Sequence, residues 1–195
     1  MKVDVELVKQ IREKTSASVI ECKKALEEAG GDPEKAIEIL KKQGLLISQK
    51  KAHRETKEGL IGAYIHTNGK VGVLIEVNTE SDFVARNDEF KELVKNLTLQ
   101  IAASDPKWID RESIPLDVLE KEKQIYREQF KDKPPAVIEK IVEGKMEDFY
   151  KANVLLDQQF IKDEDITVKD YVNSKIAKLG ENIRIRRFVK YELGE

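Results

Sequence analysis

The sequence predicts an α+β fold, in which several amphipathic helices accompany one small antiparallel sheet. Apolar residues recur at helical spacing over most of the chain. Two stretches of alternating character, 60–66 and 71–77, flank Asn68-Gly69, a dipeptide typical of β-hairpin turns. A third alternating stretch, 182–193, closes the chain and can pair with the hairpin. Helices combined with a short antiparallel sheet define the α+β class.

The first 45 residues are expected to form three short helices. The first is predicted from about Asp4 to Lys14. Ser18 and Glu21 have the spacing of a capping box, in which each side chain bonds the free backbone N–H of the other, so the second helix begins there. Its apolar stripe consists of Cys22, Ala25, Leu26 and Ala29.

Turn residues separate the second helix from the third. Gly30-Gly31 tolerates the positive φ values at which helices end. Asp32 is expected to cap the third helix, with Pro33 at its first position, where the missing N–H costs nothing. We expect this helix to end at Gly44.

A basic segment with few apolar residues, 49–54, comes next. It is predicted to be a linker or an exposed helix that joins two domains. The predicted domains are residues 1–54, a three-helix module with its linker, and residues 55–195, an α+β core.

The core is expected to open with a β-hairpin and to continue with helices. Asn68-Gly69 tolerates the positive φ values of a type I′ hairpin turn. Further helices are predicted after Ser81, over 116–131, over 135–153 and from Thr167 to Gly180. The helix after Ser81 has an apolar stripe that Asp105-Pro106 ends, formed by Phe90, Leu93, Val94, Leu97 and Ile101.

The closing stretch is predicted to be a strand with one apolar face. That face would contain Ile183, Ile185, Val189, Tyr191 and Leu193. Arg187 falls on the same face, where a charged side chain is not expected. The pattern therefore predicts a β-bulge or a partly solvated edge at Arg187.

Composition excludes several classes of protein. The 35 basic and 37 acidic side chains give a net charge of −2, so the basic excess of a nucleic-acid-binding protein is missing. The sequence has neither a signal peptide nor a run of apolar residues long enough to span a membrane. Cys22 is the only cysteine and cannot form an internal disulfide, which fits a reducing compartment. We therefore expect a cytoplasmic protein that binds neither nucleic acid nor membrane.

Residues that could carry catalysis are scarce. The two histidines, His53 and His66, lie far from each other and from Cys22, and no metal-ligand spacing such as CxxC or HExxH occurs. No glycine-rich phosphate loop follows a strand, and no GxSxG motif is present. The sequence predicts a protein that acts by binding rather than an enzyme, without catalytic residues, metal or cofactor.

Three segments of the chain match the motifs of one known family. The first joins 7–15 (LVKQIREKT) to 21–29 (ECKKALEEA). The second is 71–87 (VGVLIEVNTESDFVARN), and the third is 180–188 (GENIRIRRF). Together, in this order and at these intervals, they resemble the elongation factor Ts family over most of the chain.

The resemblance implies a function and an assembly. Members of this family are guanine-nucleotide exchange factors, which bind elongation factor Tu in its GDP-bound and nucleotide-free states and promote release of GDP. The resemblance also implies that residues 1–54 contain a ubiquitin-associated-like module that docks on the GTPase domain of elongation factor Tu. Longer members carry two related core halves, whereas this chain has room for one, so a homodimer and a 2:2 complex are expected. Some shorter members have a cysteine where this chain has Val189, so a disulfide-linked dimer is not expected.

The resemblance assigns the exchange activity to a wedge of four residues, Ser81, Asp82, Phe83 and Val84. In the family, the matching Asp-Phe pair inserts near the Mg²⁺ site of the partner and disturbs the surroundings of the metal. Ser81 or Asp82 can cap the following helix and leave Phe83 in its first turn. The alternative is that Asp82 is only an N-cap and Phe83 only a core residue.

A second anchor is expected on the helical module. Ile20 lies about 160° around the helix from Cys22 and therefore off the buried stripe, while Val19 lies at the margin of the stripe. These two residues match the apolar pair through which the family's module grips its partner. Lys23, Lys24 and Lys51 are expected to be solvated, with steering of the partner as the alternative.

A different class of protein also fits part of the chain. A protein-interaction adaptor with a ubiquitin-associated-like module would explain residues 1–45, but it would leave 81–87 and 180–188 without a role. A nucleic-acid-binding protein is disfavoured by the acidic balance and by an aromatic content of 6%.

Overall fold

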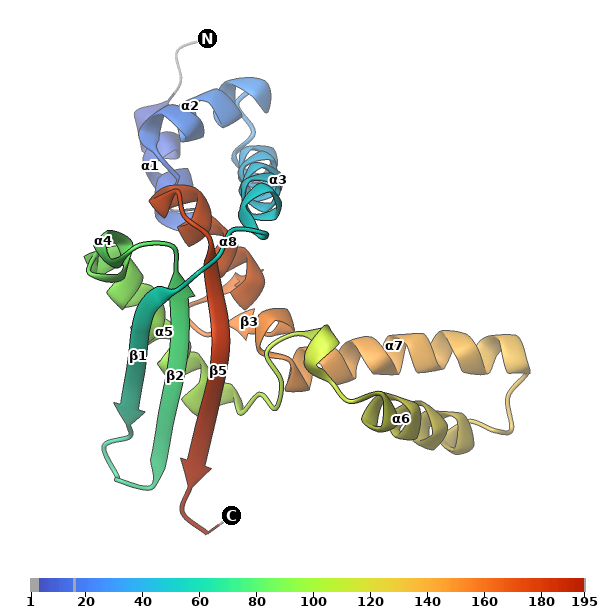
Figure 1. Cartoon of the computed structure of the whole chain (residues 1–195). Coiled ribbons are helices and arrows are strands. Elements are labelled where there is room, and N and C mark those ends of the chain that lie inside the picture. Colours follow the sequence, from blue (N-terminus) through green and yellow to red (C-terminus); the bar gives the residue numbers. More distant parts are fainter. Residues whose placement is uncertain (1–3, 16, 195) are drawn as a thin grey trace. The chain divides into compact units, whose positions relative to one another are not determined.

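The computed structural model describes residues 4–15 and 17–194. The chain forms two compact units, the first from residues 1–102 and 169–195 and the second from residues 103–168. Helices and a small antiparallel sheet make up the first unit, so the predicted α+β class is confirmed (Figure 1). The boundary predicted between residues 54 and 55 lies inside the first unit and stays a prediction.

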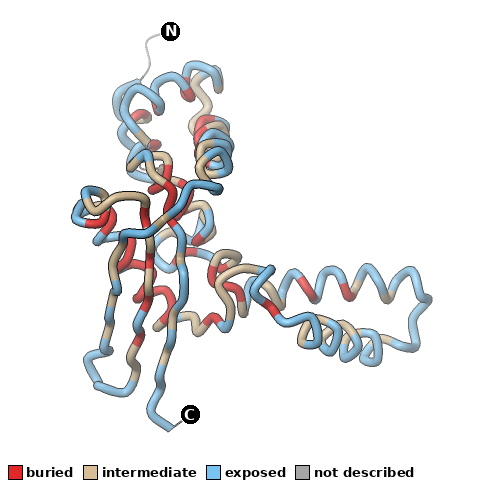
Figure 2. The backbone as a smooth tube through the Cα atoms, in the orientation of Figure 1, coloured by how far each residue is buried: buried red, intermediate tan, exposed pale blue. Residues whose placement is uncertain are grey.

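Three helices at the start of the chain enclose a core of their own. They are α1 (Val5–Thr15), α2 (Val19–Glu28) and α3 (Pro33–Lys51). Figure 2 shows buried positions on the inward side of each helix. The buried cluster consists of Val8, Ile11, Cys22, Ala25, Leu26, Ala36 and Leu40. Cys22 is a buried apolar-like residue, and burial raises the pKa of its thiol.

The helix caps predicted for this module are confirmed. The Ser18 side chain accepts from the backbone N–H of Glu21, whose carboxylate accepts from the backbone N–H of Ser18. Asp32 caps α3, with Pro33 in its first turn. Gly30-Gly31 has φ values of 66° and 92°, which only glycine adopts without strain.

The prediction that α3 ends at Gly44 is wrong. The helix continues to Lys51, and Gly44 is a buried residue within it. A Cβ at Gly44 would lie 3.9 Å from the backbone oxygen of Asn173, an ordinary van der Waals contact, so Gly44 is a packed position inside α3 rather than a helix end. The helix formers that follow, among them Leu45 and Leu46, continue the hydrogen-bonded turns, because one glycine costs a helix only about 1 kcal/mol.

The sheet contains three antiparallel strands in the order β1-β2-β5: β1 (Glu58–Ile65), β2 (Val71–Thr79) and β5 (Ile183–Glu192). The inner face of β2 presents buried Val73, Ile75 and Val77. A Cβ at Gly62 of β1 would lie 2.4 Å from Cγ1 of Val94, so this strand lies directly against the helix that carries Val94. That helix is α5 (Asp88–Ser104), and all five residues of its predicted stripe are buried.

The hairpin is confirmed, but its turn differs from the prediction. A four-residue loop joins the strands, since the backbone N–H of His66 donates to the oxygen of Val71 over 2.8 Å. Within the loop, the N–H of Gly69 donates to the oxygen of His66 over 2.8 Å. Gly69 has a φ of 69°, whereas Asp105 is the one non-glycine residue with positive φ among the described residues. Asn68 therefore lacks the left-handed conformation that a type I′ turn requires.

The predicted bulge is confirmed in β5. Glu76 pairs with Arg187 and Val77 with Ile185, which leaves Arg186 as the extra residue. The bulge reverses the faces of the rest of the strand. The prediction that all apolar residues of β5 share one face is therefore wrong: Val189, Tyr191 and Leu193 are exposed, while Ile183 is buried.

Two further helices complete the first unit. The short helix α4 (Asp82–Ala85) follows β2, and α8 (Val168–Leu179) precedes β5. The Nζ of Lys175 on α8 donates to the Glu89 carboxylate of α5 over 2.6 Å, and Lys178 donates to the same carboxylate. Tyr171 accepts from the Asn96 amide over 2.7 Å, and burial raises the Tyr171 pKa to about 12.

The second unit contains the two predicted helices, α6 (Leu116–Gln129), which ends two residues earlier than predicted, and α7 (Pro135–Asn153), which has the predicted bounds. Two 3₁₀ turns, Arg111–Ser113 and Leu155–Asp157, and a two-stranded sheet, β3 (Gln159–Phe160) and β4 (Asp163–Thr167), accompany them. Arg111 binds the carboxylates of Glu147 and Asp157. Within the described part of the chain, no helix has the length and the apolar character needed to cross a bilayer.

Candidate partner-binding site

The predicted wedge forms the short helix α4 at the end of β2. Ser81 has extended backbone angles, and its hydroxyl accepts from the backbone N–H of Val84 over 3.4 Å. Asp82 pairs with Arg86 over 3.0 Å, one helical turn away. The wedge therefore begins with a serine cap, and Asp82 lies inside the first turn rather than at the cap.

Phe83 projects into solvent from this first turn. Its exposed fraction is 85%, so the alternative that Phe83 is a core residue does not hold. Ala85, two residues later, is buried and is the residue of α4 that packs inward. A phenyl ring that is largely exposed, on a helix whose start is held in place, can bury most of its surface against a partner.

The carboxylate of Glu181 fixes the start of the wedge. It accepts from the Ser81 hydroxyl over 2.6 Å, from the Ser81 backbone N–H over 3.0 Å and from the Thr79 hydroxyl over 2.9 Å. Burial by itself would raise the pKa of Glu181. The hydrogen bonds from Ser81 and Thr79 outweigh that effect and hold the pKa below its ordinary value.

The second predicted anchor lies at the start of α2. Val19 and Ile20 are 52% and 68% exposed, whereas Cys22 is buried. Lys23 and Lys24 are exposed, and Lys51 donates to the backbone oxygen of Gly180 over 2.7 Å. The two anchors belong to different elements of the first unit, α2 and α4, so they form two separate contact points.

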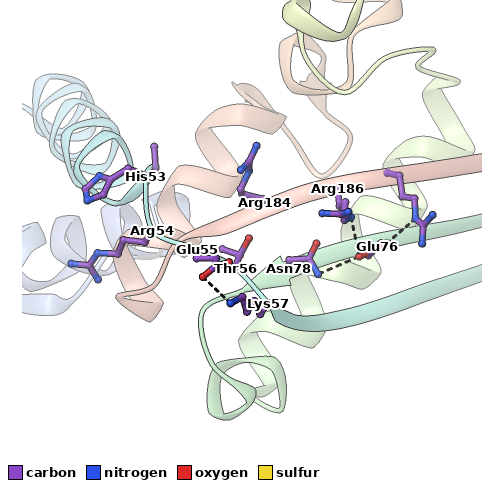
Figure 3. Close-up of a pocket in the computed structure, with 11 residues that line it drawn as sticks. His53, Arg54, Glu55, Thr56, Lys57, Glu76, Asn78, Arg184 and Arg186 are labelled. Carbon is purple, nitrogen blue, oxygen red and sulfur yellow. Dashed lines mark hydrogen bonds and ion pairs between the residues drawn. The ribbon is translucent and has the colours of Figure 1, made fainter.

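A charged groove lies between the segment that leaves α3 and the strands β2 and β5 (Figure 3). Its volume is about 690 Å³. Glu76 binds Arg187 over 2.7 Å and Arg186 over 3.6 Å. The lining comprises Ala52, His53, Arg54, Glu55, Thr56, Lys57, Glu76, Asn78, Arg184, Arg186 and Arg187. An open groove with so few apolar atoms suits electrostatic contact with a macromolecule better than enclosure of a small substrate.

The outer face of the sheet is apolar toward the β1-β2 hairpin loop and the end of β5. On neighbouring strands, Ala63 pairs with Leu74 and Leu74 with Val189. Ile61, Ile65, Leu74, Val189 and Tyr191 are all exposed there. We call this set the outer sheet face. The sequence pattern missed it because the bulge reverses the faces of β5.

Among residues 4–15 and 17–194, no three His, Cys, Asp or Glu side chains gather as a metal site would require. His66 lies beside the hairpin turn, where its Nδ1 is 2.8 Å from the Tyr64 hydroxyl. His53 belongs to the lining of the charged groove.

Comparison with known proteins identifies the family of the chain. The family model described as "Elongation factor TS" matches residues 3–195. The chain belongs to the elongation factor Ts family. It is 57% identical over 197 residues to the elongation factor Ts of Fervidobacterium nodosum, and each chain is covered completely.

Other elongation factor Ts proteins are similarly close. The protein of Thermotoga neapolitana is 57% identical over 195 residues, which cover 100% of this chain and 99% of the relative. The protein of Thermodesulfovibrio yellowstonii is 56% identical over 196 residues, which cover 100% and 98%. The chain thus belongs to a family of factors for translation elongation, a step of protein biosynthesis, and it has the full length of these relatives.

Sequence reasoning selected the residues of the two candidate anchors but missed the residues that bond to one of them. Glu181 and Asn182 lie about 100 residues from the wedge in the chain, yet Glu181 bonds to Ser81, its first residue, and Asn182 bonds to Glu80, the residue before it. The only signal was a pair of polar residues between a helix that ends at Gly180 and a strand. Such a pair is also what any exposed turn contains.

Proposed function

We propose that this chain is the guanine-nucleotide exchange factor of elongation factor Tu. It would bind elongation factor Tu in its GDP-bound and nucleotide-free states and promote release of GDP so that GTP can bind. Membership of the elongation factor Ts family supports this function. The single structural observation that carries it is the exposure of Phe83 at the tip of a capped helical turn.

An exchange factor of this kind needs no catalytic side chain. A GTPase holds GDP through its phosphates and a Mg²⁺ ion, so unassisted release is slow. A protein that binds the empty GTPase better than the GDP-bound form weakens GDP binding by the same factor. The requirement is therefore a surface that fits only the state in which the Mg²⁺ and phosphate site is disturbed.

The wedge, residues 81–84, supplies that surface in this proposal. Burial of a phenyl side chain removes roughly 150–250 Å² from water. At about 25 cal/mol per Å², this corresponds to ~4–6 kcal/mol before ordering costs are subtracted. Because Phe83 is already held on a helical turn, less ordering is needed on binding. A net contribution of a few kcal/mol changes a nucleotide equilibrium by orders of magnitude.

Val19 and Ile20 supply the second contact. They are apolar residues exposed in the first turn of α2, on a module whose core lies on the opposite side of the helix. Such a contact binds the partner in all its nucleotide states, so it contributes affinity rather than discrimination. The charged groove and the exposed Lys23 and Lys24 add electrostatic attraction for the partner.

A homodimer forms through the outer sheet face in this proposal, which gives a 2:2 complex with elongation factor Tu. In a single copy of the chain, this face exposes apolar side chains from all three strands. A two-fold axis lets the same face of a second copy cover it, as in most homodimers. The face contains no cysteine, and Cys22, the single cysteine of the chain, is buried, so the dimer is not disulfide-linked.

The dimer can be tested by light scattering. Leu74→Asp places a charge at the centre of the outer sheet face and should give a monomer. Leu116→Asp is the matched control, because Leu116 is also an exposed leucine but lies on α6. A wild-type monomer at micromolar concentration, or a dimer that survives Leu74→Asp, would contradict this assembly.

The function is tested by loss of labelled GDP from elongation factor Tu. Excess unlabelled GTP is added, and release is followed with and without one-tenth of a molar equivalent of this protein. Acceleration for the whole population of elongation factor Tu is expected, since each exchange factor acts many times. The rival adaptor would bind elongation factor Tu without acceleration, and that result would exclude the proposal. Cytoplasmic location, where elongation factor Tu works, is part of the same proposal.

A further inference from the structure

The turn of Gly180, Glu181 and Asn182 joins α8 to β5. Gly180 has a φ of 74°, a left-handed conformation that suits glycine at the end of a helix. The turn lies beside the end of β2, because Thr79 pairs with Ile183 as the last pair of the sheet. The side chain of Glu181 therefore meets Thr79 and Ser81, the first residue of the wedge.

Glu181 directs its carboxylate toward the start of the wedge. Both oxygens are used: Oε1 accepts from the Ser81 hydroxyl, while Oε2 accepts from the Ser81 backbone N–H and the Thr79 hydroxyl. The same Ser81 hydroxyl caps α4 through the N–H of Val84. Glu181 thus fixes the hydroxyl that determines where α4 begins.

Asn182 holds the other side of the turn. Its amide Nδ2 donates to the backbone oxygens of Arg54 over 2.8 Å and Ala52 over 3.4 Å, both in the segment that leaves α3. Its backbone N–H donates to Oε1 of Glu80, the residue before Ser81, over 2.6 Å. Asn182 is almost fully buried, so these bonds are shielded from water.

The wedge depends on support from outside its own helix. Helix α4 has four residues, and a single helical turn is unfavourable by itself because many dihedral angles are fixed for few hydrogen bonds. Phe83 is exposed and adds no packing energy in the free protein. The position of this turn is therefore determined by the packing of Ala85, by the cap and by what holds the cap.

We propose that Glu181 is a positioning residue for nucleotide exchange, which presents Phe83 to the partner by holding Ser81 in place. Asn182 ties the linker of the helical module to the same turn. This proposal rests on the proposed exchange function. Loss of Glu181 leaves the second anchor, Val19 and Ile20, intact, so the partner still binds. The wedge must then be ordered during binding, and this cost slows GDP release.

The test separates affinity from the maximal rate of GDP release. Glu181→Ala should lower the release rate at saturating exchange factor about tenfold, with the concentration for half-saturation changed less than about threefold. Glu181→Gln keeps the volume and one oxygen acceptor, and it should restore about half of the loss on a logarithmic scale. Glu89→Ala is the control: it removes a carboxylate that bonds Lys175 and Lys178 and none of residues 79–84.

A double-mutant cycle with Phe83→Ala decides whether Glu181 acts through the wedge. If it does, Glu181→Ala should add less than about twofold to the loss caused by Phe83→Ala alone. Additive losses, a full rate for both Glu181 variants, or equal losses for Glu89→Ala would overturn the positioning role. Full activity of Phe83→Ala would instead contradict the wedge itself, so the two failures can be told apart.

Discussion

The two proposed anchors share one local design and differ in how it is supported. Each consists of a serine N-cap followed by an exposed apolar residue in the first helical turn: Ser18 before Val19 and Ile20, and Ser81 before Phe83. In each, the serine hydroxyl accepts from a backbone N–H three residues later. A serine cap leaves the first-turn side chains free to point outward, which suits a contact residue.

The support of the two caps is local in one case and distant in the other. Glu21, three residues after Ser18, completes a capping box within α2. Glu181, 100 residues after Ser81, holds the cap of α4. Helix α2 has ten residues and buries three of them, whereas α4 has four residues and buries one. The first anchor therefore needs only its own helical module to be folded. The second also needs β2 and β5 to be paired, because this pairing brings Glu181 to Ser81.

Phe83→Ala should have the largest effect on exchange. It removes the phenyl ring that the wedge buries, and hot-spot truncations cost about 2 kcal/mol or more, which is about 30-fold or more in rate. Stopped-flow release of labelled GDP measures the change. Because Phe83 is exposed, the melting temperature should stay within about 2 °C of wild type. A rate within about twofold of wild type would show that the ring is not the wedge.

Ile20→Asp should weaken complex formation rather than the maximal rate. A charge in place of an exposed apolar contact is expected to lower affinity for elongation factor Tu about tenfold, or about 1.4 kcal/mol. Titration calorimetry measures the affinity, and circular dichroism checks that the module stays folded. Leu46→Asp is the matched control, since Leu46 is also exposed on this module, on α3. Equal affinities for Ile20→Asp and wild type would remove α2 from the interface.

Removal of each serine hydroxyl should give opposite patterns. Ser18→Ala breaks a local cap and should cost about 1 kcal/mol of unfolding free energy, with little change in the exchange rate at saturation. Ser81→Ala should slow exchange about threefold and change stability less, because α4 contributes little burial. Chemical denaturation and the GDP-release assay are run on both variants. Identical patterns would mean that the two caps serve the same purpose.

The smallest expected effect is a pH dependence of stability at Glu181. Its pKa is lowered in the folded protein by the hydrogen bonds from Ser81 and Thr79, which outweigh burial. A carboxylate with a lowered folded pKa contributes stability above its unfolded pKa, and this contribution is lost as the pH falls through the folded value. The difference in unfolding free energy between wild type and Glu181→Ala should therefore be constant well above the unfolded glutamate pKa of about 4.3 and shrink as the pH falls below it. A difference that stays constant below this pKa would contradict the ionic role of Glu181.

Local signals explain what the sequence predicted correctly. Ser18 with Glu21, and Asp32 with Pro33, determine helix starts through contacts within three residues, so pattern and structure agree. The stripe of α5 is another local repeat, and it is buried as predicted. The exposure of Ile20 followed from helical geometry in the same way. The role of Ile20 in binding a partner stays a prediction.

The errors arise where one residue type does not decide the local structure, or where the partner of a residue lies far away in the chain. Helix α3 continues past Gly44 because one glycine costs a helix only about 1 kcal/mol and helix formers follow it. The hairpin lacks a type I′ turn because Asn68 keeps a negative φ, which the dipeptide alone does not determine. The sequence could not pair Ser81 with Glu181, since the chain has 37 acidic side chains and no local pattern selects one of them as the partner of Ser81.

The extra residue at Arg186 has a consequence for the register of this strand. With the bulge, Arg187 lies opposite Glu76, and Val189 and Tyr191 lie on the outer face. Regular pairing of the same sequence after Ile185 would instead turn Arg187, Val189 and Tyr191 toward the core and Phe188 toward solvent. That register would bury the Arg187 guanidinium without its partner Glu76, which is costly. The charge on Arg187 therefore holds the strand in the register that leaves the apolar end of β5 available to another molecule.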